Sequence, residues 1–285
     1  AEHIQHCSTL MKSQLDVDLS SGRGSLWLKS DYRSSDGVIF TARHRSDDHF
    51  SRLSHIAFSE SADRFACVDE KGDVYTFQLR ANRFSCIHSA KRTVSALIFV
   101  AGQDNHIALA LSDHSICIIS SDDGRLIDKM SSHRSTIVCL APHPTSKFLV
   151  SCGSDATILW NLYPARRMRT VAADGRFSQA AFLHSGNTLL LLSRKQGISI
   201  LHFPSLELRA RLLPAERAPG QSLPTSPTLL HMAISHDGMF LFAATGDRRA
   251  YVWHLPSETM TAQLDLSCPL AAGAAGAAPP LQPVP

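Results

Sequence analysis

The sequence predicts an all-β fold, a β-propeller built from repeated blades. Three observations support this prediction: an order of strands and turns recurs about every forty residues, the second strand of each unit is apolar without a break, and no stretch sustains a helical periodicity. The best-preserved unit runs from a His-bearing turn through an apolar strand and an Asp turn to a strand that contains Trp. Its marker residues are His133, Ser151, Asp155 and Trp160.

Five units are visible, and each begins with an apolar strand. These strands start near Leu53, Val94, Ile137, Phe177 and Leu229, at steps of 41, 43, 40 and 52 residues. The last step is long because residues 214–228 form a Pro/Ser/Ala-rich insertion that cannot extend a strand ladder. A partial unit precedes the five, with residues 27–28 and 38–42 as candidate strands. Since propellers contain about four to eight blades, we expect part of a ring, most simply a seven-bladed one.

Each unit repeats the same internal order of strands. A polar turn follows the first strand, and the second strand is apolar enough to be buried on both faces between stacked blades. These second strands are residues 65–68, 107–111, 148–152, 188–192 and 240–244. A turn with Gly or Asp leads to the third strand, at residues 74–78, 116–120, 158–161, 198–202 and 250–254. A fourth, more polar strand closes the unit.

The marker residues of the third unit predict a buried polar network. In this pattern, which resembles the WD repeat, the His, Ser, Asp and Trp satisfy polar groups that burial between blades would leave unpaired. The interval from Asp155 to Trp160 is one residue shorter than usual, so the contact between His133 and Asp155 stays open. The other units keep only parts of the network: Asp113 in the second, and Asp247 with Trp253 in the fifth. We therefore expect apolar packing to hold most blades.

Composition bounds the other properties of the chain. A net charge of +3 and 7% aromatic residues argue against nucleic-acid binding, and no apolar run approaches the roughly 18–20 residues of a membrane span. The seven scattered cysteines, without a C-x-x-C pair, indicate reduced thiols in a cytoplasmic protein. We expect residues 1–25 to be an N-terminal extension, 26–266 the WD-repeat propeller and 267–285 a disordered low-complexity tail. The missing initial Met and this tail predict a fragment.

Two classes of function remain open. A non-catalytic protein-interaction scaffold, without a cofactor, is favoured; a propeller enzyme such as a metal-dependent hydrolase would need several ligands on the innermost strands, where only His55 and His231 qualify. The basic strand with Arg166, Arg167 and Arg169 either binds an acidic partner or is a solvated outer edge. Residues 225–227 (Thr-Ser-Pro) are either a phosphorylation site or part of a tolerated insertion.

Several segments are specific enough to suggest a family. Residues 36–39, 72–77, 81–84, 108–116, 154–160 and 251–253 carry the resemblance. Over residues 26–260 the chain resembles the N-terminal WD-repeat propeller of TBC domain family member thirty-one, also called WD repeat-containing protein sixty-seven. The resemblance implies a scaffold of the centrosome, centriolar satellites and ciliary base that acts in cilium assembly. It also implies a Rab GTPase-activating-type TBC domain and coiled coils further along the chain.

The partners implied by this resemblance are proteins. They are centrosomal and ciliary scaffold components, with Rab-pathway proteins reached through the other domains of such a protein. Nothing in the present sequence resembles the Arg and Gln motifs of a TBC domain. An adaptor with unrelated WD repeats is the alternative within the same functional class.

Overall fold

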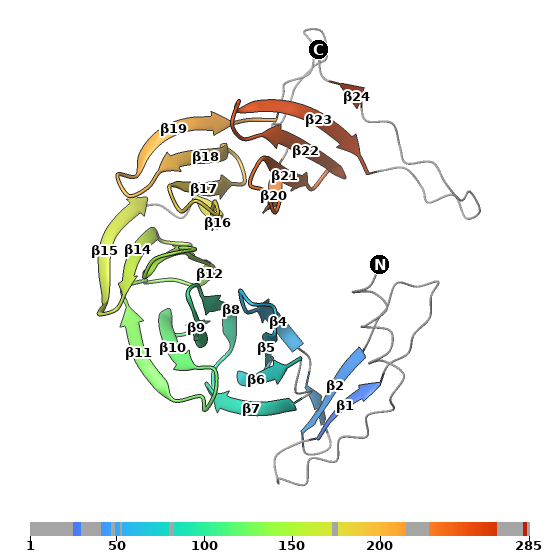
Figure 1. Cartoon of the computed structure of the whole chain (residues 1–285), viewed down its shortest axis with the longest axis vertical. Helices are drawn as coiled ribbons and strands as arrows, with labels where there is room; N and C mark the ends of the chain where they lie inside the picture. The colour runs from blue at the N-terminus through green and yellow to red at the C-terminus, as the bar shows by residue number, and fades with distance from the viewer. Residues whose placement is uncertain are drawn as a thin grey trace, which may run out of the picture.

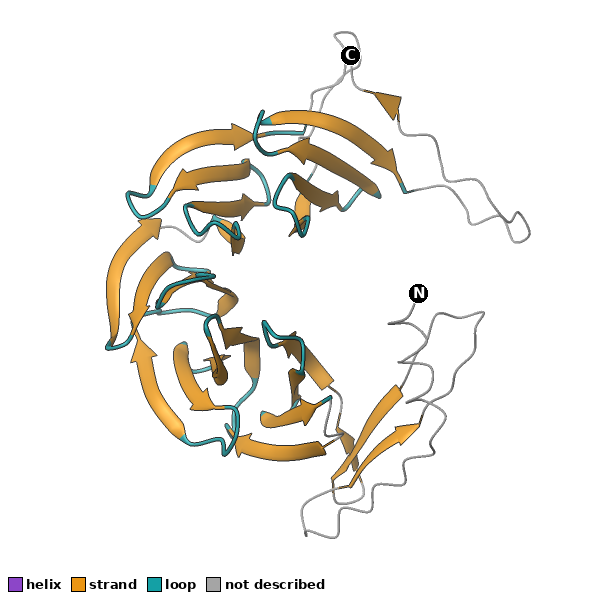
Figure 2. Ribbon diagram, in the orientation of Figure 1, coloured by secondary structure: helices purple, strands orange, loops and turns teal. Residues whose placement is uncertain are grey.

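The computed structural model describes residues 25–29, 41–46, 49–51, 53–79, 83–172, 176–214, 228–266 and 282–283. Every regular element in these ranges is a β-strand (Figure 2). In this part of the chain, no helix is long and apolar enough to cross a membrane. The N-terminal extension up to residue 24, most of the insertion with its candidate phosphorylation site, and most of the tail lie outside the described residues.

Five antiparallel sheets of consecutive strands form the blades. Blades one and two contain β4 (Leu53–Phe58), β5 (Arg64–Asp69), β6 (Asp73–Gln78), β7 (Arg83–Ser89), β8 (Val94–Val100), β9 (Gln103–Leu111), β10 (Ser115–Ser120) and β11 (Leu126–Ser131). Blades three and four contain β12 (Ile137–Pro142), β13 (Phe148–Gly153), β14 (Thr157–Leu162), β15 (Ala165–Ala172), β16 (Phe177–Phe182), β17 (Thr188–Ser193), β18 (Gly197–His202) and β19 (Glu207–Leu212). Blade five contains β20 (Leu229–Ile234), β21 (Phe240–Thr245), β22 (Arg249–His254) and β23 (Thr259–Asp265), with β24 (Gln282–Pro283) paired to β23. A separate three-stranded sheet contains β1 (Ser25–Lys29), β2 (Thr41–Ser46) and β3 (His49–Ser51).

The blades stand in an arc around a common centre (Figure 1). In each blade the first strand lies toward the centre and the fourth strand forms the outer rim. The predicted all-β WD-repeat propeller is confirmed, with five complete blades in the described residues. The closed seven-bladed ring stays a prediction.

A β-bulge recurs at the start of every innermost strand. The strand register shifts across one residue there, and this residue is Ser54, Ser95, Val138, Ser178 or Leu230 in blades one to five. A bulged residue leaves the hydrogen-bond ladder and its side chain is re-aimed. The same position of each blade therefore directs a side chain differently from the regular strand.

The second strands carry most of the apolar core. From their second residue onward, β5, β13 and β17 are buried on both faces. For β13 and β17 the reason is that each lies between two neighbouring blades. The same prediction was wrong for β21, where Phe240 and Phe242 are exposed at 36% and 41%. Their face is the end of the arc, and no blade of the described chain packs against it.

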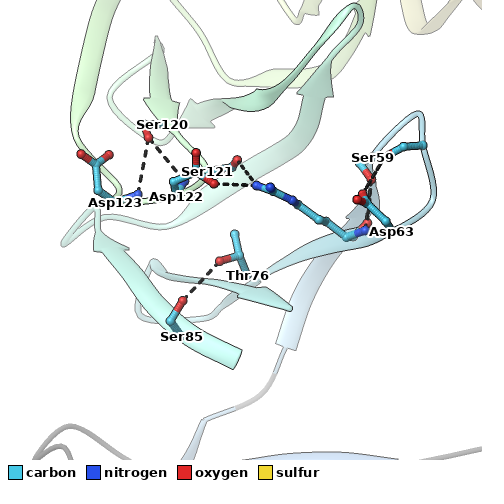
Figure 3. Close-up of polar contacts among 10 residues, drawn as sticks. Ser59, Asp63, Thr76, Ser85, Ser120, Ser121, Asp122 and Asp123 are labelled. Carbon is cyan, nitrogen blue, oxygen red and sulfur yellow. Dashed lines mark hydrogen bonds and ion pairs between the residues drawn. The ribbon is translucent and has the colours of Figure 1, made fainter. Parts of the chain in front are cut away.

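Polar contacts also join neighbouring blades. Arg64 of blade one donates to the carboxylate of Asp122 in blade two at 2.6 Å, near the turn that holds Ser59 and Asp63 (Figure 3). The remaining pairs of blades are joined by His106 with Tyr163, by His143 with Gly186, and by Gln179 with Met232. None of these contacts belongs to the WD-repeat pattern, so the sequence did not predict them.

Candidate functional site

The antiparallel order of the strands gives the propeller two opposite faces, and each face carries a different set of turns. One face, which we call the His133 face, carries the turns between second and third strands together with the links between blades. The turns between first and second strands lie on the opposite face, which we call the His143 face. Because loops carry most binding residues while strands hold them in place, these two faces are the candidate interaction surfaces.

The predicted network of blade three comes together on the His133 face. The Nε1 of Trp160 donates to the Oγ of Ser151 at 2.7 Å, and this Oγ lies 2.7 Å from the Nε2 of His133. The Nδ1 of His133 lies 2.8 Å from the Oδ1 of Asp155. A neutral His133 with its proton on Nδ1 satisfies every group, since Ser151 then donates to Nε2 and accepts from Trp160. The network closes the contact between blades two and three.

The shortened turn of blade three accommodates the His133–Asp155 contact because of Gly153. A Cβ on this residue would lie 2.5 Å from the Oδ1 of Asp155 and 2.6 Å from the Nδ1 of His133, so any other side chain would displace one of them. The Gly153 amide also closes the turn onto the carbonyl of Ala156 at 2.8 Å. Without a Cβ at this point, a turn one residue shorter still brings the carboxylate to the imidazole.

Asp155 is held in its ionised form. Burial alone would raise its pKa, but hydrogen bonds from the Arg134 amide, from His133 and from Ser135 outweigh burial and lower the pKa below its ordinary value. The carboxylate thus accepts from three donors in residues 133–135, the link between blades two and three. Its role in this arrangement is structural.

The other marker residues form only partial networks. Asp113 accepts from Ser115 and from the Nζ of Lys129 at 3.1 Å, and these bonds lower its pKa to about 2 although burial opposes them. In blade five, Asp247 accepts from Thr245, while Trp253 is buried against blade four. Ala243 occupies the position in β21 that Ser151 has in β13, and it offers Trp253 no acceptor. These blades rest mainly on apolar packing.

The predicted basic strand forms part of the outer rim. Arg166, Arg167 and Arg169 are exposed on β15, the outermost strand of blade three. Arg169 donates to the carbonyl of Ser205 in blade four at 3.0 Å, and Arg167 donates to Thr170. Cations on an unpaired strand edge discourage association with other strands. The geometry fits the solvated outer edge, while binding of an acidic partner here stays a prediction.

A basic pocket lies on the His133 face between blades three and four. It has a volume of about 410 Å³ and is lined by the turns and strand starts of both blades, including Ser154, Arg176, Ser178, Arg194 and Lys195. Sequence reasoning missed it, although Lys195 in place of the turn Asp was visible. Comparing the five turns would have found the signal, because only blade four of the described chain lacks a carboxylate there.

An apolar pocket lies on the His143 face. Its volume is about 260 Å³, and residues of blades one to four line it, including Phe58, Phe99, Pro142 and Phe182. Beside it, the ring of His143 is packed 4.9 Å from that of Phe182, and its pKa is lowered by burial. This hollow has the shape and composition of a contact for apolar side chains.

The described residues provide few groups for catalysis. No three His, Cys, Asp or Glu side chains in this part of the chain are placed to hold one metal ion. His55 contacts Ser54, and among the described residues no carboxylate is paired with His55 or His231. Burial raises the pKa of the Cys67 thiol to about 12 and also raises those of Cys117, Cys139 and Cys152, so these thiols are poor nucleophiles.

Comparison with known proteins agrees with this architecture. Residues 124–161 match the family described as WD domain, G-beta repeat. The matched unit begins before the outer strand of blade two and ends in β14 of blade three, so the sequence repeat spans two structural blades. The network of His133, Ser151 and Trp160 lies at this junction.

The chain is also similar to TBC1 domain family member 31. The protein of Xenopus tropicalis is 25% identical over 246 residues, which are 83% of this chain and 22% of the relative. The Homo sapiens protein is 24% identical with the same coverage, and the Bos taurus protein is 25% identical over 86% of this chain and 23% of its own length. The resemblance seen in the sequence is confirmed. The chain spans about a fifth of the length of the curated relatives it matches, and its WD repeats support a protein-interaction propeller module.

Proposed function

We propose that this chain is a non-catalytic scaffold that binds partner proteins through the two ends of its propeller. The observation that carries the proposal is the pair of pockets, one basic and one apolar, each built by several blades. Pockets of this kind suit side chains of a protein partner, whereas catalysis needs convergent reactive groups. Centrosomal and ciliary scaffold proteins are the partners that the similarity favours.

The proposal includes a cellular setting. The chain acts in the cytoplasm at the centrosome, centriolar satellites or ciliary base, as part of a larger TBC-type protein whose other domains reach the Rab pathway. The similarity to TBC1 domain family member 31 supports this setting. Imaging of the tagged chain in ciliated cells tests it. Enrichment around the centrioles is expected, and an even cytoplasmic signal would contradict the location.

Partner binding is tested separately by proximity labelling. The tagged chain should label a specific set of proteins. Phe58→Asp on the His143 face and Lys195→Glu on the His133 face should each remove some of these proteins from the set. Identical labelling by the chain and by both variants would overturn the role of the two faces. Metal analysis of the purified chain discriminates the enzyme alternative: a stoichiometric bound metal would revive it.

A further inference from the structure

The basic pocket between blades three and four differs in charge from the equivalent region of every other described blade. Arg176, Arg194 and Lys195 line it, and none of the described lining residues is acidic. Arg176 lies within reach of Gln196, at 3.5 Å from its side-chain oxygen. Arg194 and Lys195 form no ion pair with a carboxylate in the described chain. Arg194 and Lys195 thus lie side by side in the turn, and no described residue supplies a counter-charge for them.

The other four blades show what the usual counter-charge is. Their corresponding turns contain Asp69, Asp113, Asp155 and Asp247. Asp69, Asp113 and Asp247 accept hydrogen bonds from their own turn or the strand that follows it, and Asp155 accepts from the link that precedes its blade. In blade four the hydroxyl of Ser193 takes this structural role, because it accepts from the Gln196 amide at 3.3 Å. The turn therefore closes without an acid. Its two cations, Arg194 and Lys195, have no carboxylate partner among the described residues and can bind an external group.

A buried hydroxyl provides a second, independent observation. Ser178 occupies the bulge of β16 and lines the pocket. The bulge serines of blades one and two, Ser54 and Ser95, donate to carbonyls of their own blades at 3.2 and 3.4 Å. The hydroxyl of Ser178 is buried and has no hydrogen-bond partner among the described residues. Buried polar groups are normally paired, so an unpaired one on a pocket wall indicates a missing ligand group.

We propose that this pocket binds a phosphorylated serine or threonine in a peptide segment of a partner protein. A phosphate carries close to two negative charges at neutral pH and three strong acceptor oxygens. A guanidinium group such as that of Arg194 binds such oxygens by two parallel hydrogen bonds, the Lys195 ammonium adds charge, and the Ser178 hydroxyl supplies one more donor. The apolar wall formed by Val138 and Phe177 gives the residue beside the phosphate a surface to pack against. The proposal rests on the proposed function and specifies that some of the partner proteins are phosphorylated.

Fluorescence polarisation with the 285-residue chain tests the proposal. The probe is a library of labelled peptides of random flanking sequence, each with a central phosphoserine or phosphothreonine, against the same peptides unphosphorylated. We expect preference for the phosphorylated form by at least about tenfold, and loss of that preference in Arg194→Glu/Lys195→Glu. Ser178→Ala should weaken binding by roughly fivefold without lowering Tm, since its hydroxyl has no internal partner to lose.

A matched control separates the pocket from the overall charge. Lys147→Glu/Arg211→Glu makes the same charge change at exposed positions of blades three and four outside the pocket, and it should bind as the unsubstituted chain does. Equal loss in both double variants, equal binding of unphosphorylated peptides, or binding of inorganic phosphate as tight as that of the peptides would each overturn the proposal.

Proximity labelling distinguishes failure of this proposal from failure of the proposed function. If Arg194→Glu/Lys195→Glu keeps every partner of the unsubstituted chain, the pocket proposal is overturned while the interaction scaffold stands. If the unsubstituted chain labels no specific partner, the scaffold itself fails. Loss of only those partners that phosphatase treatment also removes would support the phosphopeptide.

Discussion

Blades three and four are neighbours of nearly equal size, but different chemistry holds them together. Blade three places Trp160 and Ser151 against blade two and joins them to His133 and Asp155. Blade four places Leu201 and Leu191 at the same register positions, against blade three, and has no such network. Both blades bury their middle strands equally well. A four-stranded blade therefore does not need the polar network if apolar side chains fill its place.

The difference appears at the turns. In blade three, the Asp155 carboxylate already accepts hydrogen bonds from residues 133–135, the link that precedes β12. In blade four the turn is closed by Ser193, and its two cations face outward. Polar residues that hold a blade together are unavailable to a partner, while a blade held by apolar packing leaves its turn free to bind one.

The largest effect is expected from Trp160→Ala. Its side chain is 2% exposed, so truncation leaves a cavity, removes one of the two hydrogen bonds of the Ser151 hydroxyl and should cost about 4 kcal/mol of unfolding free energy. Leu201→Ala in blade four should cost less, about 3 kcal/mol, because a smaller volume and no hydrogen bond are lost. Urea unfolding of both variants measures the two costs. A larger cost for Leu201→Ala would reverse the comparison.

Ser151→Ala should lower the free energy of unfolding by about 2 kcal/mol, because it leaves the buried Nε1 of Trp160 and the Nε2 of His133 without their hydrogen-bond partner. The double variant Ser151→Ala/Trp160→Phe also removes the indole N–H that Ser151→Ala leaves unpaired. It should cost less than the sum of the two single changes in a double-mutant cycle. Additive costs would show that the network contributes no cooperative stability.

Asp155→Asn should cost about 1 kcal/mol at neutral pH, because charge-assisted hydrogen bonds are replaced by neutral ones. The folded-state pKa of Asp155 is lowered, so its contribution is fully present above pH about 4 and is lost as the pH falls through the folded pKa. The gap in unfolding free energy between the chain and the variant should therefore shrink on acidification. Unfolding at pH about 7, 4 and 2.5 checks this, and a gap that widens would contradict the lowered pKa.

The smallest effect is expected in the turn of blade four. Lys195→Ala should change the unfolding free energy by less than about 0.5 kcal/mol, because the exposed ammonium has no partner in the described chain. Thermal unfolding of Lys195→Ala and of Asp155→Asn under the same conditions compares the two losses of stability directly. A loss as large as that of Asp155→Asn would show that the cation is structural, and would weaken the case for an external ligand.

Much of the fold could be predicted because its signals are local. The apolar second strands, the polar turns between them and the marker residues of blade three are all visible within about forty residues of sequence. The prediction was wrong for Phe240 and Phe242, because burial of a strand depends on whether a neighbouring blade exists, and composition does not report that. The contacts of Arg64, His106 and Gln179 were missed for the same reason, since each joins separate blades.

The sequence by itself determined the all-β repeat, the strand order and which residues of blade three can form a polar network. These depend on side-chain period and turn chemistry, which act over short distances along the chain. The tertiary structure alone decided that the network closes across a shortened turn, because the space left by Gly153 is visible only in three dimensions. It also decided that Arg194 and Lys195 share one pocket with Ser178, since the bulge of β16 and the turn after β17 meet only when the strands pair.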